Sequence, residues 1–266
     1  MNTAAGAGAA KEAFSRQAAV FDRIDEANPL IGWVRERVRK ASLACMHAGE
    51  RVLELNAGTG IDSVFLAEQG LQVLATDQAP GMVRELQAKQ RPGLTLEVME
   101  LSFLDLARLQ GRTFDHVFSN FGGLNCTDRL DEVVRNAYGL LRPGGHLHLV
   151  IMPRTCLWEL AWMFQGRFKE AFRRRRKNGT RALVEDVAFT CHYYDPSEVI
   201  AMVPGAHRVL HLQGLSVLYP PPHAQAIATG WPAATTWLGR LDDRISRTRP
   251  FRAWGDHYHL IIQRKA

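Results

Sequence analysis

The fold of this chain is decided at residues 52–60, which read VLELNAGTG. The apolar residues predict a short strand buried on both faces, as in the middle of a parallel sheet. Residues 61–67 then have the composition of a helix. Glycine adopts backbone angles that a side chain forbids, and it lets a ligand approach the main chain closely. Because open α/β sheets bind small molecules at the carboxyl ends of their strands, this glycine turn is a candidate ligand site.

A second apolar run, residues 72–76, ends at Asp77. A carboxylate after the second strand is placed to accept hydrogen bonds from two ribose hydroxyls. The two strands therefore indicate a cofactor that contains a nucleoside. A dinucleotide site would require the pattern G-x-G-x-x-G. Here an acid, Glu54, leads the turn, Asn56, Gly58 and Gly60 follow at alternate positions, and no third glycine comes two residues later.

This order resembles motif I of the class I S-adenosylmethionine-dependent methyltransferases, acid-x-Gly-x-Gly-x-Gly. Asn56 replaces the first glycine, and asparagine is one of the few side chains that tolerate a left-handed backbone. The resemblance implies that Gly58 and Gly60 shape the methionine end of the cofactor site. It also implies that Glu54 supports the turn or the amino group, and that Asp77 holds the ribose.

Further stretches extend the resemblance over residues 14–153. Residues 114–126 resemble motif IV, the strand and loop beside the methyl donor, and residues 141–147 resemble the Pro-Gly-Gly turn before the fifth strand. After the third predicted strand, the family's usual Asp and small residue are replaced by Leu101 and Ser102. The cofactor-binding residues implied by the resemblance are Glu54, Asn56, Gly58, Gly60, Asp77, Gln78, Leu101, Ser102 and Asn120.

The alternation of predicted strands and helices indicates an α/β fold. We expect a doubly wound, seven-stranded, mostly parallel sheet with an antiparallel seventh strand and helical lid insertions. Residues 1–47 would be an N-terminal helical segment covering the cofactor, disordered over residues 1–12. Residues 48–153 would form the Rossmann-like core, residues 154–206 a lid that contains one long helix or two over 157–176, and residues 207–266 the last two strands with a second insertion at 219–255.

Composition limits the compartment and the cofactor. The chain has 266 residues and a net charge of +6 with histidine neutral. Its four cysteines are far apart and form no C-x-x-C pair, which indicates reduced thiols rather than disulfides or a metal site. The first ten residues lack a signal-peptide pattern, and no apolar stretch is long enough to cross a bilayer. We therefore expect a cytoplasmic protein without a bound metal.

The predicted lid ends in a basic run at residues 173–177, RRRRK. We favour a solvated helix end, where cations suit the helix dipole. Recognition of an anionic group on the substrate is the second interpretation, and contact with an anionic membrane surface, which we do not favour, is the third. Nucleic acid is not expected as a partner, because no nucleic-acid module accompanies the run. The oligomeric state is left open.

The acceptor site is expected under the insertions. The predicted substrate-binding residues are aromatic or imidazole side chains from these segments: Trp158, Trp162, His192, Tyr193 and Tyr219. The seventh strand, being antiparallel, would begin beside the cofactor, so His257 is the candidate general base near neutral pH. A structural histidine at a strand end is the interpretation that we prefer for it.

We predict an S-adenosylmethionine-dependent methyltransferase that acts by in-line transfer. The acceptor would be an oxygen or nitrogen atom of a small, partly apolar metabolite, anionic or lipid-like in character, with carbon as a further option. Two alternatives remain, an NAD-dependent oxidoreductase with a Rossmann core and a non-catalytic methyltransferase-like binding protein.

Overall fold

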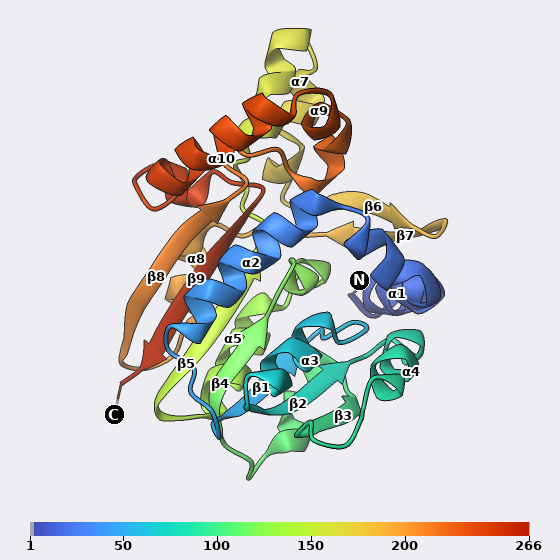
Figure 1. Ribbon diagram of the computed structural model, residues 1–266, viewed down its shortest axis with the longest axis vertical. Helices are drawn as coiled ribbons and strands as arrows, with labels where there is room; N and C mark the ends of the chain where they lie inside the picture. Colours follow the sequence, from blue (N-terminus) through green and yellow to red (C-terminus); the bar gives the residue numbers. More distant parts are fainter. Residues whose placement is uncertain (1–2, 266) are drawn as a thin grey trace.

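A seven-stranded sheet forms the centre of the protein (Figure 1). The computed structural model describes residues 3–265. The strands lie in the spatial order β3-β2-β1-β4-β5-β9-β8, and β9 runs antiparallel to both of its neighbours. The predicted fold class is confirmed. The strand bounds are β1 Arg51–Leu55, β2 Gln72–Asp77, β3 Leu96–Glu100, β4 Phe114–Ser119, β5 Leu141–Ile151, β8 His207–Leu215 and β9 His257–Arg264.

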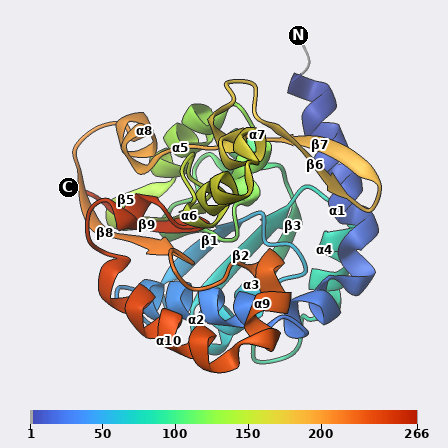
Figure 2. The same cartoon turned by 90° about the horizontal axis from the view of Figure 1, so that it is seen from above.

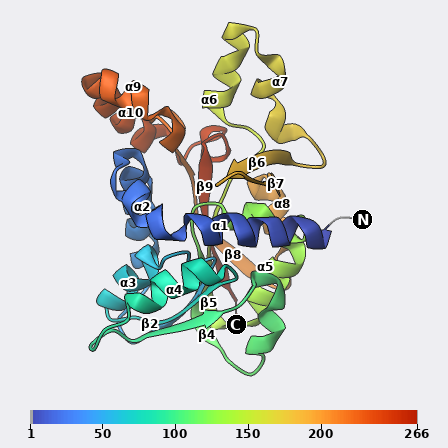
Figure 3. The same ribbon diagram turned by 90° about the vertical axis from the view of Figure 1, so that its right-hand side faces the viewer.

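Helices cover both faces of this sheet (Figure 3). One apolar layer joins the sheet to α2 (Pro29–Leu43), α3 (Ile61–Glu68) and α4 (Pro80–Ala88). The opposite layer joins it to α5 (Leu130–Gly139), α8 (Pro196–Met202) and the 3₁₀ turn Phe103–Leu109. Because both faces are covered, the central strands are apolar nearly throughout, as the sequence of β1 indicated.

The first helix, α1 (Thr3–Glu26), lies across the carboxyl ends of β1, β2 and β3 (Figures 1 and 3). The expected disorder is therefore wrong for residues 3–12, while residues 1–2 lie outside the described part. Two contacts fix the helix. The Gly81 N–H donates to Ser15 Oγ at 2.9 Å, and the Phe14 ring meets Phe189 with centroids 5.7 Å apart. A methyl group on Gly81 would come within 2.3 Å of the Ser15 carbonyl oxygen.

The insertion at residues 154–206 is more broken than the one or two helices expected over 157–176. It contains α6 (Leu157–Leu160), α7 (Phe168–Ala171) and two 3₁₀ turns, Ala161–Gln165 and Arg173–Arg175. Gly166, at φ 72°, separates the two halves. The insertion also contains β6 (Thr180–Val184) and β7 (Val187–Cys191), which pair in a separate two-stranded hairpin.

The second insertion contains α9 (Gln225–Gly230) and α10 (Pro232–Ile245). Seen from above, both insertions rise over the same end of the sheet, where the parallel strands finish (Figure 2). None of the helices that the structure describes combines the length and apolar composition of a membrane span.

Five histidines form a band across four strands of the sheet. His116 lies on β4, His146 and His148 on β5, His259 on β9 and His211 on β8. Successive rings pack with centroids 5.1–6.3 Å apart. Burial lowers the pKa of all five side chains, to about 4 for His211. The band therefore stays neutral in the folded protein at pH values where free histidines accept a proton.

This band predicts that the protein loses stability in mild acid. Below pH 6.5 the His211 side chain is protonated in the unfolded chain. In the folded protein the same side chain stays neutral until the pH approaches its pKa of about 4. More protons on the unfolded state mean that the free energy of unfolding falls as the pH drops through this window. His211→Leu should flatten that slope by up to about 1.4 kcal/mol per pH unit. Urea unfolding between pH 7 and pH 4 measures the slope.

The control is Leu210→Ala, because Leu210 is the chain neighbour of His211, is 41% exposed and carries no titratable group. This change should leave the slope as in the unmodified protein. Equal slopes for all three proteins would contradict the prediction.

Candidate active site

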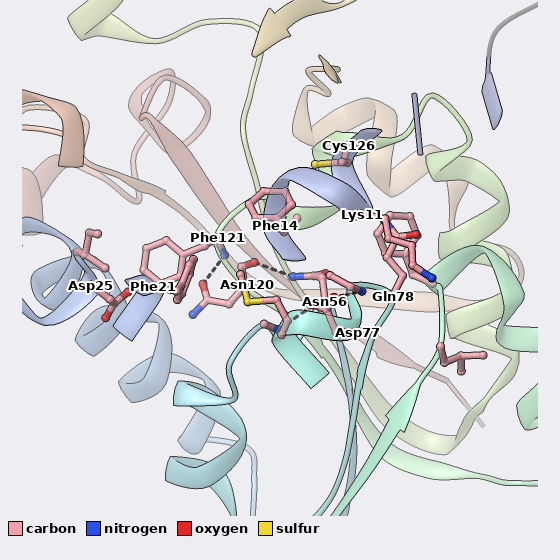
Figure 4. A pocket seen from close by; sticks show the side chains of 18 of the residues that line it. Lys11, Phe14, Phe21, Asp25, Asn56, Asp77, Gln78, Asn120, Phe121 and Cys126 are labelled. Carbon is pink, nitrogen blue, oxygen red and sulfur yellow. Dashed lines mark hydrogen bonds between the residues drawn. The ribbon is translucent and has the colours of Figure 1, made fainter. Parts of the chain in front are cut away.

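A cavity opens at the carboxyl ends of β1, β2 and β4, beneath α1 (Figure 4). Its empty volume, counted together with its open mouth, is about 940 Å³. Most of its lining is apolar. Six of the nine predicted cofactor residues line it: Asn56, Gly58, Asp77, Gln78, Leu101 and Asn120.

The glycine turn presents its main chain to this cavity. Asn56, Gly58 and Gly60 all have positive φ, at 46°, 58° and 83°. No heavy atom lies within 4 Å of a Cβ placed on Gly58, so its backbone is open to a ligand. A Cβ on Gly60 would lie 2.0 Å from Leu86 Cδ1, and Gly60 is not part of the lining. Gly58 is thus exposed to the cavity, whereas Gly60 lets α4 pack against the turn.

Asn56 joins the turn to the loop after β4. Its Nδ2 donates to the Asn120 carbonyl oxygen at 3.1 Å, and its Oδ1 accepts from Ser119 Oγ at 2.7 Å. A Cβ on Gly123 would lie 2.5 Å from Asn56 Cγ, so the two segments touch closely. The asparagine that replaces the first glycine of motif I therefore keeps the left-handed backbone and adds a cross-strand connection.

Asp77 receives two backbone hydrogen bonds at the end of β2. The Gly58 N–H donates to Oδ2 at 2.9 Å, and the Ala79 N–H donates to Oδ1 at 2.8 Å. Burial raises the pKa of Asp77, and these N–H groups oppose the shift. Each carboxylate oxygen has a second lone pair, so the side chain keeps acceptor capacity toward the cavity.

Three predicted cofactor residues, Glu54, Gly60 and Ser102, do not line the cavity. Glu54 is 2% exposed and accepts from Ser63 Oγ at 2.5 Å. Burial, reinforced by the nearby Asp62, raises the pKa of Glu54 to about 8. Ser102 Oγ accepts from the Leu104 N–H at 3.2 Å and begins a 3₁₀ turn. Glu54 and Ser102 therefore support the walls of the site.

Sequence reasoning missed Arg35, which enters the cavity from α2. Its guanidinium binds Asp62 and Asp25, and it lies 4.5 Å over the Phe121 ring. Its Nε is buried without a hydrogen-bond partner in the described protein. Asn120 Nδ2 also donates to Asp62, at 2.8 Å. Arg35 was missed because its position among the arginines of α2 gives no sequence signal that distinguishes it.

Helix α1 closes the cavity from above. Phe14 and Phe21 point into it, as Figure 4 shows. Next to Phe21, Asp22 accepts a hydrogen bond from Thr59 Oγ1 in the glycine turn and pairs with Lys89 on the far side of α4. Asp22 thereby fastens α1 to the turn.

His257 lies behind the loop after β4. Its Nδ1 is 3.0 Å from Asp256 Oδ2, so Nε2 is the ring nitrogen left to face Gly122. A Cβ on Gly122 would lie 3.1 Å from this Nε2. The Phe121 ring, which lines the cavity, meets the His257 ring at 6.3 Å. His257 is buried and stands one residue away from the cavity wall.

The five predicted substrate residues do not line the cavity, and the structure places them elsewhere. The Tyr193 hydroxyl lies 3.0 Å from Thr180 Oγ1, and the Tyr219 ring stacks on Trp33 at 3.9 Å. The His192 N–H donates to the Asn125 carbonyl oxygen at 2.7 Å, and Asn125 Nδ2 donates to the His192 carbonyl oxygen at 2.6 Å. Trp158 and Trp162 are half-buried within the first insertion. The aromatic walls of the cavity come instead from α1, from the 3₁₀ turn after β3 and from the loop after β4.

The basic run is only partly a solvated helix end. Arg174 is 3% exposed, and it binds Glu159 at 2.8 Å and Asp256 Oδ1 at 2.6 Å. Arg173 also binds Glu159, at 2.6 Å. These cations lower the pKa of Glu159, and His257 and Arg174 hold the pKa of Asp256 far below its usual value. Arg174 therefore anchors the insertion next to the start of β9, and Arg173 braces Glu159 within the insertion.

The remaining residues of the run are exposed, namely Arg175, Arg176 and Lys177. Among residues 3–265, no group of three His, Cys, Asp or Glu side chains has the geometry of a metal site.

Comparison with known proteins agrees with this geometry. Residues 52–145 match the family described as "Methyltransferase domain". This chain carries a class I methyltransferase domain. A putative S-adenosylmethionine-dependent methyltransferase from Listeria monocytogenes has the same fold, with a TM-score of 0.60 at 13% identity over 88% of this chain and 98% of that one. S-adenosylmethionine is the cofactor that such a domain is built to bind.

Curated relatives resemble the domain more closely in sequence. A demethylmenaquinone methyltransferase of Beutenbergia cavernae is 36% identical over 140 residues, 49% of this chain and 55% of that protein. A ubiquinone biosynthesis O-methyltransferase of Xanthomonas axonopodis pv. citri is 32% identical over 126 residues, 45% of this chain and 50% of that protein. The chain thus spans about half the length of these relatives.

A further solved structure covers nearly all of this chain. The 1,6-didemethyltoxoflavin-N1-methyltransferase of Burkholderia thailandensis aligns over 99% of this chain and 91% of its own, with a TM-score of 0.54 at 14% identity. At that identity the likeness establishes the fold alone.

The buried cluster around Arg174 predicts a large loss of stability when its cation is removed. Arg174→Met would leave the Asp256 carboxylate buried with one cation fewer, which should cost about 3–5 kcal/mol of unfolding free energy. The neighbouring Arg175 is exposed, so Arg175→Met should change stability by less than about 0.5 kcal/mol. Urea unfolding of both variants measures the difference. Equal stabilities would contradict the assignment.

Proposed function

We propose that this protein transfers the methyl group of S-adenosylmethionine to an oxygen or nitrogen atom of a small, partly apolar acceptor. The observation that carries the proposal is the shared cavity, in which open Gly58 backbone and the Asp77 carboxylate meet an apolar region under α1. The polar end of the cavity suits an adenosyl amino acid, and its aromatic end suits an apolar acceptor.

The residues present fit the cofactor. Asp77 has spare acceptor capacity for the ribose hydroxyls, and Leu101 with Phe103 offers apolar surface to the adenine. The main chain at Gly58 is open toward the methionine end. The unpartnered Nε of Arg35, buried at the wall, is suited to the carboxylate of the cofactor.

When bound, S-adenosylmethionine supplies an already activated sulfonium methyl group. The protein therefore has to hold the acceptor atom in line with that methyl group and exclude water. Helix α1 supports both tasks, because Phe14 and Phe21 cover the cavity and the Asp22–Thr59 hydrogen bond holds the cover in place. Asn120, fixed by Asp62, would border the methyl group.

His257 is proposed as the group that takes a proton from the acceptor. Asp256 holds Nδ1 at 3.0 Å, which orients Nε2 toward the loop at Gly122. An imidazole whose Nδ1 is held in this way presents Nε2 in the geometry that a general base requires. Because His257 does not line the cavity, its role requires the Gly122–Gly123 segment to admit the acceptor atom or one bridging water.

For the acceptor, the names of the relatives suggest a class. Demethylmenaquinone and ubiquinone-pathway methyltransferases are the proteins that the domain resembles most closely among those described above. The apolar lining of the cavity is compatible with a lipid-like acceptor of that kind. An NAD-dependent oxidoreductase is disfavoured, since the turn after β1 lacks the third glycine that a pyrophosphate requires.

Calorimetry separates these functions. We expect the purified protein to bind S-adenosylmethionine and S-adenosylhomocysteine at one site and to give no heat with NAD. Binding of NAD alone would favour the oxidoreductase, and no binding to any of the three compounds would favour a protein that binds only a partner.

The assignment of the ribose to Asp77 gives a second test. Removing a charged acceptor of two hydrogen bonds should weaken binding of S-adenosylhomocysteine at least about tenfold in Asp77→Ala. Asp77→Asn keeps one side-chain oxygen that can accept a hydrogen bond from the turn. This variant therefore separates the loss of ribose binding from the loss of support for the backbone. Glu68→Ala removes a surface acid that pairs only with Arg91 and should leave affinity unchanged. Full affinity in Asp77→Ala would refute the assignment.

A further inference from the structure

Large apolar side chains are exposed at the tips of both insertions. Ten large hydrophobic residues are exposed in the described part of the chain, and six of them lie at these tips, within residues 164–172 and 227–237. Phe164 is 93% exposed and Trp231 71%. The six are Phe164, Phe168, Phe172, Ile227, Trp231 and Trp237. We call them the lid-tip residues.

The two tips point the same way. In Figures 1 and 3 the segments around α7 and around α9 and α10 rise beyond the carboxyl ends of the strands, at the far end of the long axis. They stand over the end of the sheet where the cavity lies. A flat surface brought against this end would meet both tips together.

Basic side chains accompany the first tip. Residues 161–177 contain seven Arg or Lys residues and one acid, Glu170. Arg173 and Arg174 are committed to Glu159 and Asp256 at the base of the insertion. The exposed cations that remain are Arg167, Lys169, Arg175, Arg176 and Lys177. The buried ion cluster therefore anchors the insertion while its outer side presents cations beside three phenylalanines.

This combination matches the boundary between lipid headgroups and acyl chains. Contiguous exposed aromatic surface is unfavourable in water, and monomeric soluble proteins rarely keep it without a partner. Phe and Trp rings are favoured at the level of the headgroups, and Lys and Arg are attracted to anionic lipids by about 1 kcal/mol each. The charge of the first tip is complementary to phosphate, which favours lipid over a basic or neutral protein partner.

We propose that the lid-tip residues and the adjacent cations dock onto an anionic lipid bilayer. Docking would place the cavity end of the protein against the membrane, so that a lipid-like acceptor could enter without crossing water. This inference rests on the proposed function for the nature of the acceptor. The docking itself is a property of the surface and is measured without any methyl transfer.

The test is co-sedimentation of the full chain with vesicles of phosphatidylglycerol and phosphatidylcholine, compared with phosphatidylcholine alone. We expect binding to the mixed vesicles only, weakening as salt is raised. The variant Phe164→Ser with Phe168→Ser should lower the partition coefficient at least about tenfold. Arg175→Glu with Lys177→Glu should lower it similarly. All four positions are exposed, so the fold should be kept, which thermal unfolding checks.

Matched controls come from the body of the protein. Val209→Ser removes an apolar side chain that is 39% exposed on edge strand β8, and Arg84→Glu reverses an exposed cation on α4. Neither should change vesicle binding. The proposal is overturned if the protein ignores anionic vesicles, or if the lid variants bind as well as the controls.

A second copy of the chain is the competing occupant. Light scattering without lipid would detect a dimer of this chain. The double variant Phe164→Ser and Phe168→Ser would then have a lower particle mass than the unmodified protein. Such a shift, without vesicle binding, would replace the membrane by a dimer interface. Binding of S-adenosylhomocysteine, measured separately by calorimetry, tells failure of docking apart from failure of the proposed function.

Discussion

The hydrogen bond from the Gly58 N–H to the Asp77 carboxylate is the contact on which the site depends. It joins the ends of β1 and β2, so the turn that opens the main chain and the acid that faces the cavity are held as one unit. Asn56 extends the unit to β4 through the Asn120 carbonyl. Three neighbouring parallel strands thus end in one connected polar rim, and the carboxyl edge of the sheet becomes a binding site.

Residues that are distant from this rim in the sequence cover the site and anchor the first insertion. Helix α1 reaches the turn through Asp22, and Arg35 on α2 reaches the loop after β4 through Asp62. On the opposite side, Arg174 ties the first insertion to Asp256 next to His257. A buried cation between two carboxylates is costly to disrupt, so the insertion keeps a fixed base while its tip remains exposed.

Local patterns explain where prediction succeeded. The apolar strands, the glycine turn and Asp77 are encoded within a few residues of each other, and the alternation of strands and helices indicates a mostly parallel sheet. Prediction was less accurate at residues 157–176, where helical spacing suggested one long helix or two. There Gly166 and the attraction of Arg173 and Arg174 to Glu159 divide the segment into short turns. The hairpin of β6 and β7 was missed because its turn, Glu185 and Asp186, carries no glycine to mark it.

The sequence alone determined the class of fold, the cofactor chemistry and the residues at the strand ends, because each depends on spacing over one strand and one turn. Only the tertiary structure decided which aromatic residues line the cavity, that Arg35 enters it, and that Arg174 of the basic run is buried. Those outcomes depend on contacts between segments more than twenty residues apart, such as Arg35 with Asp62 and Arg174 with Asp256. Periodicity and composition carry no information about which buried charges will meet.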